Sequence, residues 1–237
     1  MPFAVPPVDT TRKPIFTAGM KVNWEHPLNR QLMSLFVFNG YGVVYDLVRK
    51  NLLTPVNGAY VNPQEGLVCN GSNRGMLSGM VDLDLPKVGT FVIRFRNLGA
   101  TGTVGYLLHA SVYTNFAVNY TSTGSFTFYT PDGHGMTNTG TDIANGNWHT
   151  LFIMWNDSTN LKQTFIDLYT YYISTTTYDF TMPPTTGDPL EISRTASTYD
   201  AAGAFDYIAL HGCELNSAEV AGYCSNPYGT PDNPRLI

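Results

Sequence analysis

The alternation of apolar and polar residues along the chain predicts strands almost throughout. Short segments rich in β-branched and aromatic residues recur between turn residues, which is typical of an antiparallel two-sheet sandwich or jelly roll. In segment 89–98, Phe91 and Phe95 share one face of the predicted strand, whereas Arg94 and Arg96 share the other. Strands are predicted at 31–38, 66–70, 79–86, 89–98, 106–112, 116–121, 125–130, 147–156, 162–174, 189–194 and 204–212.

One segment near the C-terminus predicts a helix instead. Segment 215–224 has Asn216 at its start and Glu219 three residues later, the arrangement of a capping box that is worth about 1 kcal/mol. The helix must be short, because Asn226 and Pro227 come directly after it. The predicted fold class is therefore all-β, with one short C-terminal helix.

Both ends of the chain are rich in proline and lack a periodic pattern. Because proline has a fixed φ and no amide hydrogen, residues 1–22 predict an extended arm and residues 229–237 a similar tail, on either side of a domain at 23–228. Such ends either reach neighbouring molecules or are disordered. The candidate assembly contacts of the arm are Phe3, Val5, Ile15 and Phe16.

Composition narrows the choice of partners. The 237 residues fit one all-β domain with extensions. Only 13% of them are charged and the net charge is −5, so the basic face that nucleic acid requires is missing. No apolar signal segment opens the chain and no stretch is long enough to span a bilayer, so we predict no membrane partner and synthesis in a cytosol.

The number and spacing of the cysteines favour free thiols over disulfide bonds. An odd number of cysteines, spread as Cys69, Cys213 and Cys224, argues against a disulfide framework and favours small buried side chains. A bridge between Cys213 and Cys224 stays open, because the two flank the predicted helix.

Three phrases of the sequence resemble the laminin-G-like family of concanavalin A-like jelly rolls. GNWHTLFIMWNDSTNLKQTFID is similar to the family's Gly-x-Trp-His strand and the next strand. DPLEISRTASTYDAAGAFDYIALHGCELNSAEVAGYCSNPYG is similar to its closing module. NWEHPLNRQLMSLFVFN resembles the opening of laminin-G-like proteins encoded by tailed bacteriophages. The likeness covers about residues 23–228.

The resemblance implies which strands are neighbours. In the concanavalin A-like fold the first and last strands lie side by side, so 31–38 should lie beside 204–212. We then interpret Trp24 as an apolar anchor and His26, extended before a proline, as part of a structural clamp where the arm joins the sandwich.

The resemblance also raises expectations about the Trp-His strand and the segment after it. The family buries this strand, so Trp148 and Trp155 are expected in the core, and His149 is expected to be structural. Many members have a glycine hairpin after it, which this chain lacks, so we expect 162–174 either to run on as a longer strand or to carry a tyrosine-rich exposed face.

No enzymatic activity is predicted. Glycoside hydrolases need two carboxylates on either side of one sugar bond, and no two glutamates stand at the spacing that enzymes of this fold use. Signatures of metalloproteases, serine hydrolases and phosphate-binding loops are also missing. The glutamates are Glu25, Glu65, Glu191, Glu214 and Glu219.

No cofactor is predicted either. Laminin-G-like domains often hold Ca²⁺, and Asp82, Asp84 and Asp200 are the carboxylates that invite the comparison. They do not make a ligand set by themselves, so we nominate no metal ligands. The histidines are isolated from one another in the sequence, so they add no metal ligands.

Glycan binding would use exposed aromatic rings as stacking surfaces. Among the 15 tyrosines, those near predicted loops are the candidates, together with a histidine in a glycine-rich turn. These candidate glycan-binding residues are Tyr113, Tyr120, Tyr129 and His134.

Two functions are expected from these patterns. The first is a non-enzymatic structural protein of a phage virion, specifically a capsid decoration or cement protein, assembled in the host cytoplasm. Its terminal arms would bind the major capsid protein or other virion proteins, and it would form a homo-oligomer, with a trimer favoured. The alternative is a carbohydrate-binding module that recognises a host surface glycan on a phage tail or fibre.

Overall fold

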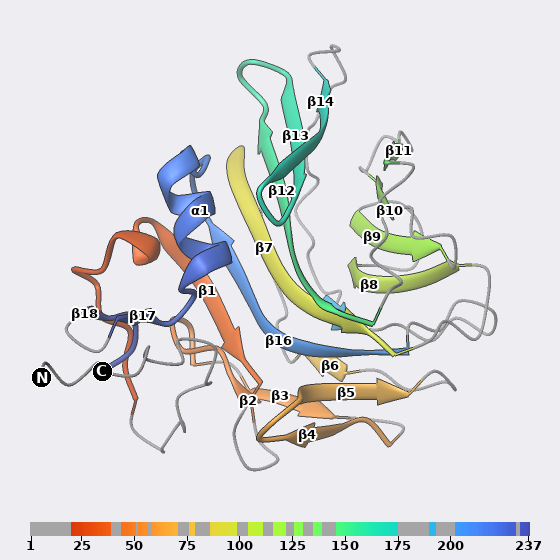
Figure 1. Cartoon of the computed structure of the whole chain (residues 1–237), viewed down its shortest axis with the longest axis vertical. Helices are drawn as coiled ribbons and strands as arrows, with labels where there is room; N and C mark the ends of the chain where they lie inside the picture. Colours follow the sequence, from red (N-terminus) through yellow and green to blue (C-terminus); the bar gives the residue numbers. More distant parts are fainter. Residues whose placement is uncertain are drawn as a thin grey trace, which may run out of the picture.

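The structure, a computed structural model, is a curved two-layer arrangement of antiparallel strands with one helix at its side (Figure 1). The residues that it describes are 20–38, 44–50, 52–55, 58–70, 76–78, 86–98, 104–110, 116–121, 126–129, 135–138, 146–174, 190–192, 202–230 and 233–237. The all-β prediction is confirmed.

The first sheet contains the longest strands of the described chain. Its order is β14-β13-β12-β7-β16-β5-β4, and β1 also pairs with β16. The pairing of β1 with β16 confirms that the first and last long strands of the fold are neighbours. The strands are β1 (Leu32–Val37), β4 (Tyr60–Asn62), β5 (Gly66–Asn70), β7 (Val88–Asn97), β12 (Trp148–Asn156), β13 (Leu161–Ile166), β14 (Tyr169–Ser174) and β16 (Ala202–His211).

The second sheet lies on the inner side of the curved first sheet (Figure 1) and has the order β11-β10-β9-β8-β15-β6-β3-β2. Its strands are β2 (Val44–Tyr45), β3 (Leu52–Pro55), β6 (Met76–Ser78), β8 (Val104–Ala110), β9 (Phe116–Thr121), β10 (Phe126–Tyr129), β11 (Gly135–Asn138) and β15 (Leu190–Ile192). A separate pair joins β17 (Gly229–Thr230) and β18 (Asn233–Pro234).

The main core fills the space between the two sheets. Phe91 and Phe95 of β7 point into it, as the alternation of that strand predicts, and pack against Phe126 and Phe128 of the second sheet. Trp155 is 1% exposed within this core, as expected. Its indole Nε1 donates to the carbonyl of Pro86 at 2.8 Å, which satisfies its polar atom.

A second, smaller core covers one half of the outer face of the first sheet. There the 3-10 helix η1 (Pro27–Asn29), the helix α1 (Ser217–Ser225) and the last residues of the chain pack over Val92 and Phe152. Tyr223 of α1 is fully buried and contacts the rings of Phe152 and Tyr207. The outer face is apolar here because it is covered.

Helix α1 begins with the predicted capping box. Asn216 accepts hydrogen bonds from the amides of Ala218 and Glu219, and Glu219 accepts from the amide of Asn216. None of the described helices has the length and hydropathy needed to cross a bilayer.

The two ends of the described chain pair with each other. The backbone of Lys21 exchanges two hydrogen bonds with Ile237, at 2.6 and 2.9 Å, and Asn23 donates to the carbonyl of Arg235. Arg235 and Leu236 are buried, so the last residues lie on their own domain. The predicted division at residues 22/23 and 228/229 stays a prediction. The candidate assembly residues Phe3, Val5, Ile15 and Phe16 lie outside the described residues.

Two local expectations were wrong. Trp24 is 60% exposed and so is not a buried anchor, whereas Leu28, two residues beyond His26, is buried. Segment 162–174 does not run on as one strand, because β13 and β14 form a hairpin at Asp167 and Leu168. Asp167 has φ 55°, so an aspartate takes the left-handed conformation that this turn requires.

The three cysteines, all among the described residues, form no disulfide, so the bridge between Cys213 and Cys224 is not made. Cys69 and Cys213 are buried, and Cys224 is partly exposed. Burial raises the pKa of the Cys213 thiol, and it raises that of Cys224 to about 12, which keeps both protonated and unreactive at neutral pH.

Candidate functional site

The half of the outer face of the first sheet that no described helix or strand covers is polar and aromatic. Its described side chains include Arg94 and Arg96 of β7, Trp148 of β12, Asp206 of β16 and Glu65 of the β4–β5 turn. We call these five residues the arginine–tryptophan patch. They lie near the end of β7 that is farther from α1.

Strand register brings the patch together. Trp148 pairs with Arg96 across β12 and β7, and Arg96 pairs with Ala204 across β7 and β16. Arg94 lies two residues from Arg96 on the same face. Both guanidinium groups therefore lie over the Trp148 indole, with their central carbons 5.8 Å and 5.3 Å from its ring centre. Such cation–π contacts hold the arginines close to the sheet.

The two arginines have different carboxylate partners. Arg94 Nε lies 3.2 Å from Asp206 Oδ2, and the side chain of Asp206 is 3% exposed. Asp206 also accepts from the Tyr228 hydroxyl at 2.6 Å. Arg96 Nη2 donates to Glu65 Oε1 at 2.8 Å, and the Glu65 side chain is 40% exposed. One pair is thus buried and fixed, while the other is open to solvent.

Arg96 keeps unused hydrogen-bonding capacity. Its Nε is shielded from solvent and has no hydrogen-bond partner in the described structure. A planar guanidinium binds a carboxylate best with two parallel N–H donors. In its contact with Glu65 only Nη2 donates, so Arg96 can bind a better-placed anion.

A histidine–aspartate pair borders the patch. His149 Nδ1 lies 2.9 Å from Asp167 Oδ2, and the other oxygen of Asp167 accepts from the Thr150 amide. Burial alone would raise the pKa of Asp167, but the His149 and Thr150 hydrogen bonds outweigh it, and the pKa lies below its usual range. His149 therefore supports the β13–β14 hairpin, which fits the structural role expected of it.

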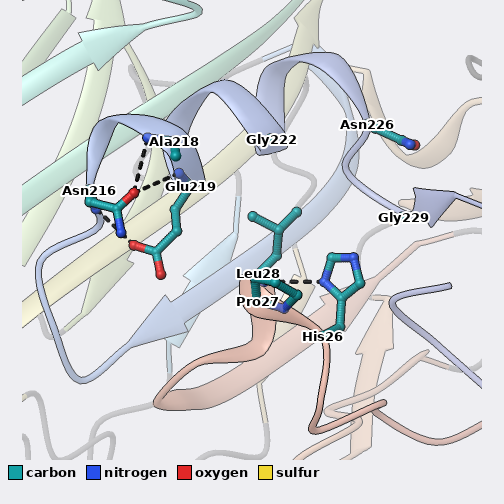
Figure 2. A pocket seen from close by; sticks show the side chains of 9 residues that line it. All are labelled: His26, Pro27, Leu28, Asn216, Ala218, Glu219, Gly222, Asn226 and Gly229. Carbon is teal, nitrogen blue, oxygen red and sulfur yellow. Dashed lines mark hydrogen bonds between the residues drawn. The ribbon is translucent and has the colours of Figure 1, made fainter. Parts of the chain in front are cut away.

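A second candidate is the open pocket between η1 and α1, a cavity of about 360 Å³ (Figure 2). Its lining residues are His26, Pro27, Leu28, Asn216, Ala218, Glu219, Gly222, Asn226 and Gly229. A Cβ on Gly222 would meet Leu28 Cδ2 at 3.0 Å, so glycine allows the two helices to approach closely.

The polar groups around this pocket already hold the two helices together. His26 Nδ1 accepts from the Leu28 amide, as Figure 2 shows, and burial, with Arg235 nearby, lowers the pKa of His26. Glu219 accepts from Arg30 Nε at 2.7 Å in addition to its capping bond. The pocket is therefore a place where the two helices pack together. These contacts agree with the interpretation of His26 as part of a structural clamp.

The sequence-predicted glycan residues stay a prediction, because the structure does not describe their side chains. Tyr113 and His134 lie outside the described residues, and Tyr120 and Tyr129 are placed only as backbone in β9 and β10. Asp82, Asp84 and Asp200 lie outside them as well. Within the described part, no three His, Cys, Asp or Glu side chains gather as a metal site would require.

Trp148 is the functional candidate that sequence reasoning misplaced. It was expected in the core with Trp155, but it is partly exposed on the opposite face of the sheet. The signal was present in the sequence, because 148 and 155 differ by an odd number and an alternating strand points such residues to opposite faces.

Comparison with known proteins supports the fold. No protein-family model and no curated protein sequence matches the chain. Trypanosoma rangeli sialidase in complex with sialic acid is 16% identical with a TM-score of 0.61, over 82% of this chain and 32% of that one. The binding domain of botulinum neurotoxin DC, in complex with rat synaptotagmin II, is 9% identical with a TM-score of 0.62, over 82% and 51%.

A botulinum neurotoxin type C chain, whose uptake by cells depends on interaction with two ganglioside molecules, is 9% identical with a TM-score of 0.61. The likeness covers 81% of the present chain and 50% of that one. The chain thus spans between a third and a half of these proteins. At these identities the comparisons show a β-sandwich of jelly-roll type and nothing finer.

The prediction that the chain is not an enzyme is corrected by these neighbours. Chains named sialidase contain this fold, so neither the fold class nor the lack of familiar motifs is a ground for excluding activity. The likeness, at 15% and 16% identity over 32% of those chains, also demonstrates no activity for this protein.

Proposed function

We propose that this protein is a carbohydrate-recognition module. The observation that carries the proposal is the arginine–tryptophan patch, where a partly exposed indole and two guanidinium groups share an outer sheet face. Proteins bind sugars with aromatic rings and a few fixed hydrogen-bond donors, and the patch has both, with the two guanidinium groups lying over the partly exposed indole. Neighbours of the same fold are described with sialic acid and with gangliosides, which supports the proposal.

A glycan array that includes neutral and acidic oligosaccharides tests this function. We expect the purified chain to bind a subset of the glycans, and Trp148→Ala to lose that binding. Trp24→Ala is the matched control, because Trp24 is 60% exposed and lies outside the patch. Failure to bind any glycan on the array would refute the proposal.

We further propose, from the phage-like opening phrase, that the chain is a laminin-G-like component of a tailed-phage particle, assembled in the host cytoplasm. The opening segment and the chain's last residues are packed together, which gives that phrase a structural role here. Mass spectrometry of purified particles tests the idea. Hundreds of copies would favour a capsid decoration protein, a few copies a tail or fibre protein, and none would refute it.

The oligomer and its contacts are part of that second proposal. A trimer bound to the major capsid protein through the N-terminal arm is the arrangement that we expect, because the last residues of the chain pack on their own domain. Light scattering of the purified chain, compared with a chain lacking residues 1–19, measures whether the arm mediates assembly.

A further inference from the structure

We infer that the arginine–tryptophan patch binds the carboxylate of an acidic sugar, and that Arg96 is the residue that holds it. This inference rests on the proposed function and adds the class of ligand. Its basis is that the structure already contains a carboxylate, that of Glu65, bound to Arg96 at 2.8 Å on an open surface.

The Glu65 carboxylate can be displaced. The side chains of Arg96 and Glu65 are 25% and 40% exposed, and ion pairs of such exposure contribute little free energy. Glu65 lies in the turn before β5, where its amide and that of Gln64 bond to Asn62 Oδ1. That turn is held by the Asn62 side chain, so it does not depend on the Arg96 contact.

The guanidinium of Arg96 is held ready for a ligand. The Trp148 ring lies under it, with the Arg96 central carbon 5.3 Å from the ring centre, and Nε has no hydrogen-bond partner among the described residues. A sugar carboxylate that replaces Glu65 can engage Nη2, the donor that Glu65 now uses.

Arg94 helps to hold the patch in place and does not bind the ligand. Its Nε is paired with the buried Asp206, and its Nη1 lies 3.4 Å from the Thr150 hydroxyl. Asp167 is also near the patch, but it is bound to His149 and the Thr150 amide. With Glu65 displaced, Arg96 is therefore the arginine of the patch whose charge is not balanced.

The test compares 3′-sialyllactose with lactose, which differ by the acidic sugar, and adds a galacturonic acid oligomer as a second acidic ligand. We expect calorimetry to show both acidic ligands binding and lactose binding at least about tenfold more weakly. Binding of the acidic ligands should weaken as salt is added.

Variants of the pair separate this inference from a general loss of structure. Arg96→Gln should weaken sialyllactose binding about tenfold or more, Arg96→Lys should restore part of it, and Glu65→Gln should strengthen it up to about fivefold by removing the competitor. Arg30→Gln is the matched control, since it removes an arginine paired with Glu219 at the covered end of the sheet.

The indole N–H signals in an NMR spectrum locate the ligand independently. Trp148 should shift on binding, whereas Trp155, which is 1% exposed, and Trp24, outside the patch, should not. Equal binding of lactose and sialyllactose, or an unchanged affinity of Arg96→Gln, would overturn the inference and leave the proposed function standing. No binding of any sugar would overturn both.

Discussion

The outer face of the first sheet has two halves built from the same strands. Over one half, β7 and β16 present Val92 and Tyr207, and helix α1 with the C-terminal residues covers them. Over the other half, the same strands present Arg96 and Asp206, with Trp148 alongside.

The difference shows how the polar side chains of a sheet differ between a part that a helix covers and a part that it does not. In the covered half several buried polar groups are paired: His211 lies between the Arg30 carbonyl at 2.9 Å and the Tyr223 hydroxyl at 2.7 Å. The Tyr207 hydroxyl differs, since it is buried without a hydrogen-bond partner among the described residues. Arg235 is 2% exposed and donates to Asn29, Pro227 and Tyr223. In the other half the Arg96 pair is weak and replaceable. The covered half stabilises the fold, and the half that no described element covers is the one for which we propose binding.

The largest effect should come from removing the ring at the centre of the covered half. Tyr223→Ala should lower the free energy of unfolding by about 3–5 kcal/mol, because a fully buried aromatic ring leaves a cavity. Chemical denaturation followed by fluorescence measures it.

Tyr223→Phe is the matched control for that change. It keeps the ring but removes the hydroxyl that bonds to His211 and Arg235, so it should cost about 1–3 kcal/mol. If Tyr223→Ala costs no more than Tyr223→Phe, the ring is not what holds the cover in place.

The next effect is a dependence of stability on pH in the covered half. Burial lowers the pKa of His211 to about 4 from its ordinary value of 6.5, against a hydrogen bond to Arg30 that raises it. Because the unfolded chain binds the proton more readily, stability is fully present above pH 6.5 and is lost as pH falls toward 4. A shift of this size corresponds to a loss on the order of 3 kcal/mol.

Denaturation curves at several pH values between 7 and 4 measure this dependence. His211→Gln should be less stable at pH 7 and should show a flatter profile over that window. Burial would raise the pKa of Glu219, but its hydrogen bond to Arg30 outweighs burial and the pKa is lowered. Protonation of Glu219 at lower pH therefore also reduces the stability of the fold. An unchanged profile in the variant would mean that other groups cause the slope.

The smallest effect on stability should come from the open half. Arg96→Gln should change the free energy of unfolding by less than about 1 kcal/mol, because the pair that it removes is exposed. Arg235→Gln is the contrasting variant and should cost more, about 2 kcal/mol, because its partners remain buried. Equal losses in thermal denaturation would contradict the distinction between the halves.

Much of the fold was predictable because it depends on local patterns. The alternation at 89–98 and the Asn216–Glu219 capping box were expected from the residues and were found. The pairing of β1 with β16 is not local, and it was expected from the family resemblance. The hairpin at Asp167 was missed because a glycine was taken to be required, although aspartate also tolerates a positive φ. Strands as short as β2 and β4 were missed because two or three residues carry no measurable periodicity.

The candidate site was not predictable in the same way. The sequence placed tyrosines near loops, whereas the described patch is assembled from strands and a turn at 65, 94, 96, 148 and 206, which no linear pattern joins.

By itself the sequence determined the all-β class, the inward face of β7 and the capped helix, because these depend on neighbours within a few residues. Only the tertiary structure decided which half of the outer face is covered. Whether a strand residue on that face meets Tyr223 or solvent depends on where α1 and the last residues of the chain pack, which is set by contacts far apart in sequence. For the same reason Val92 became core while Arg96, four residues later, became a candidate binding group.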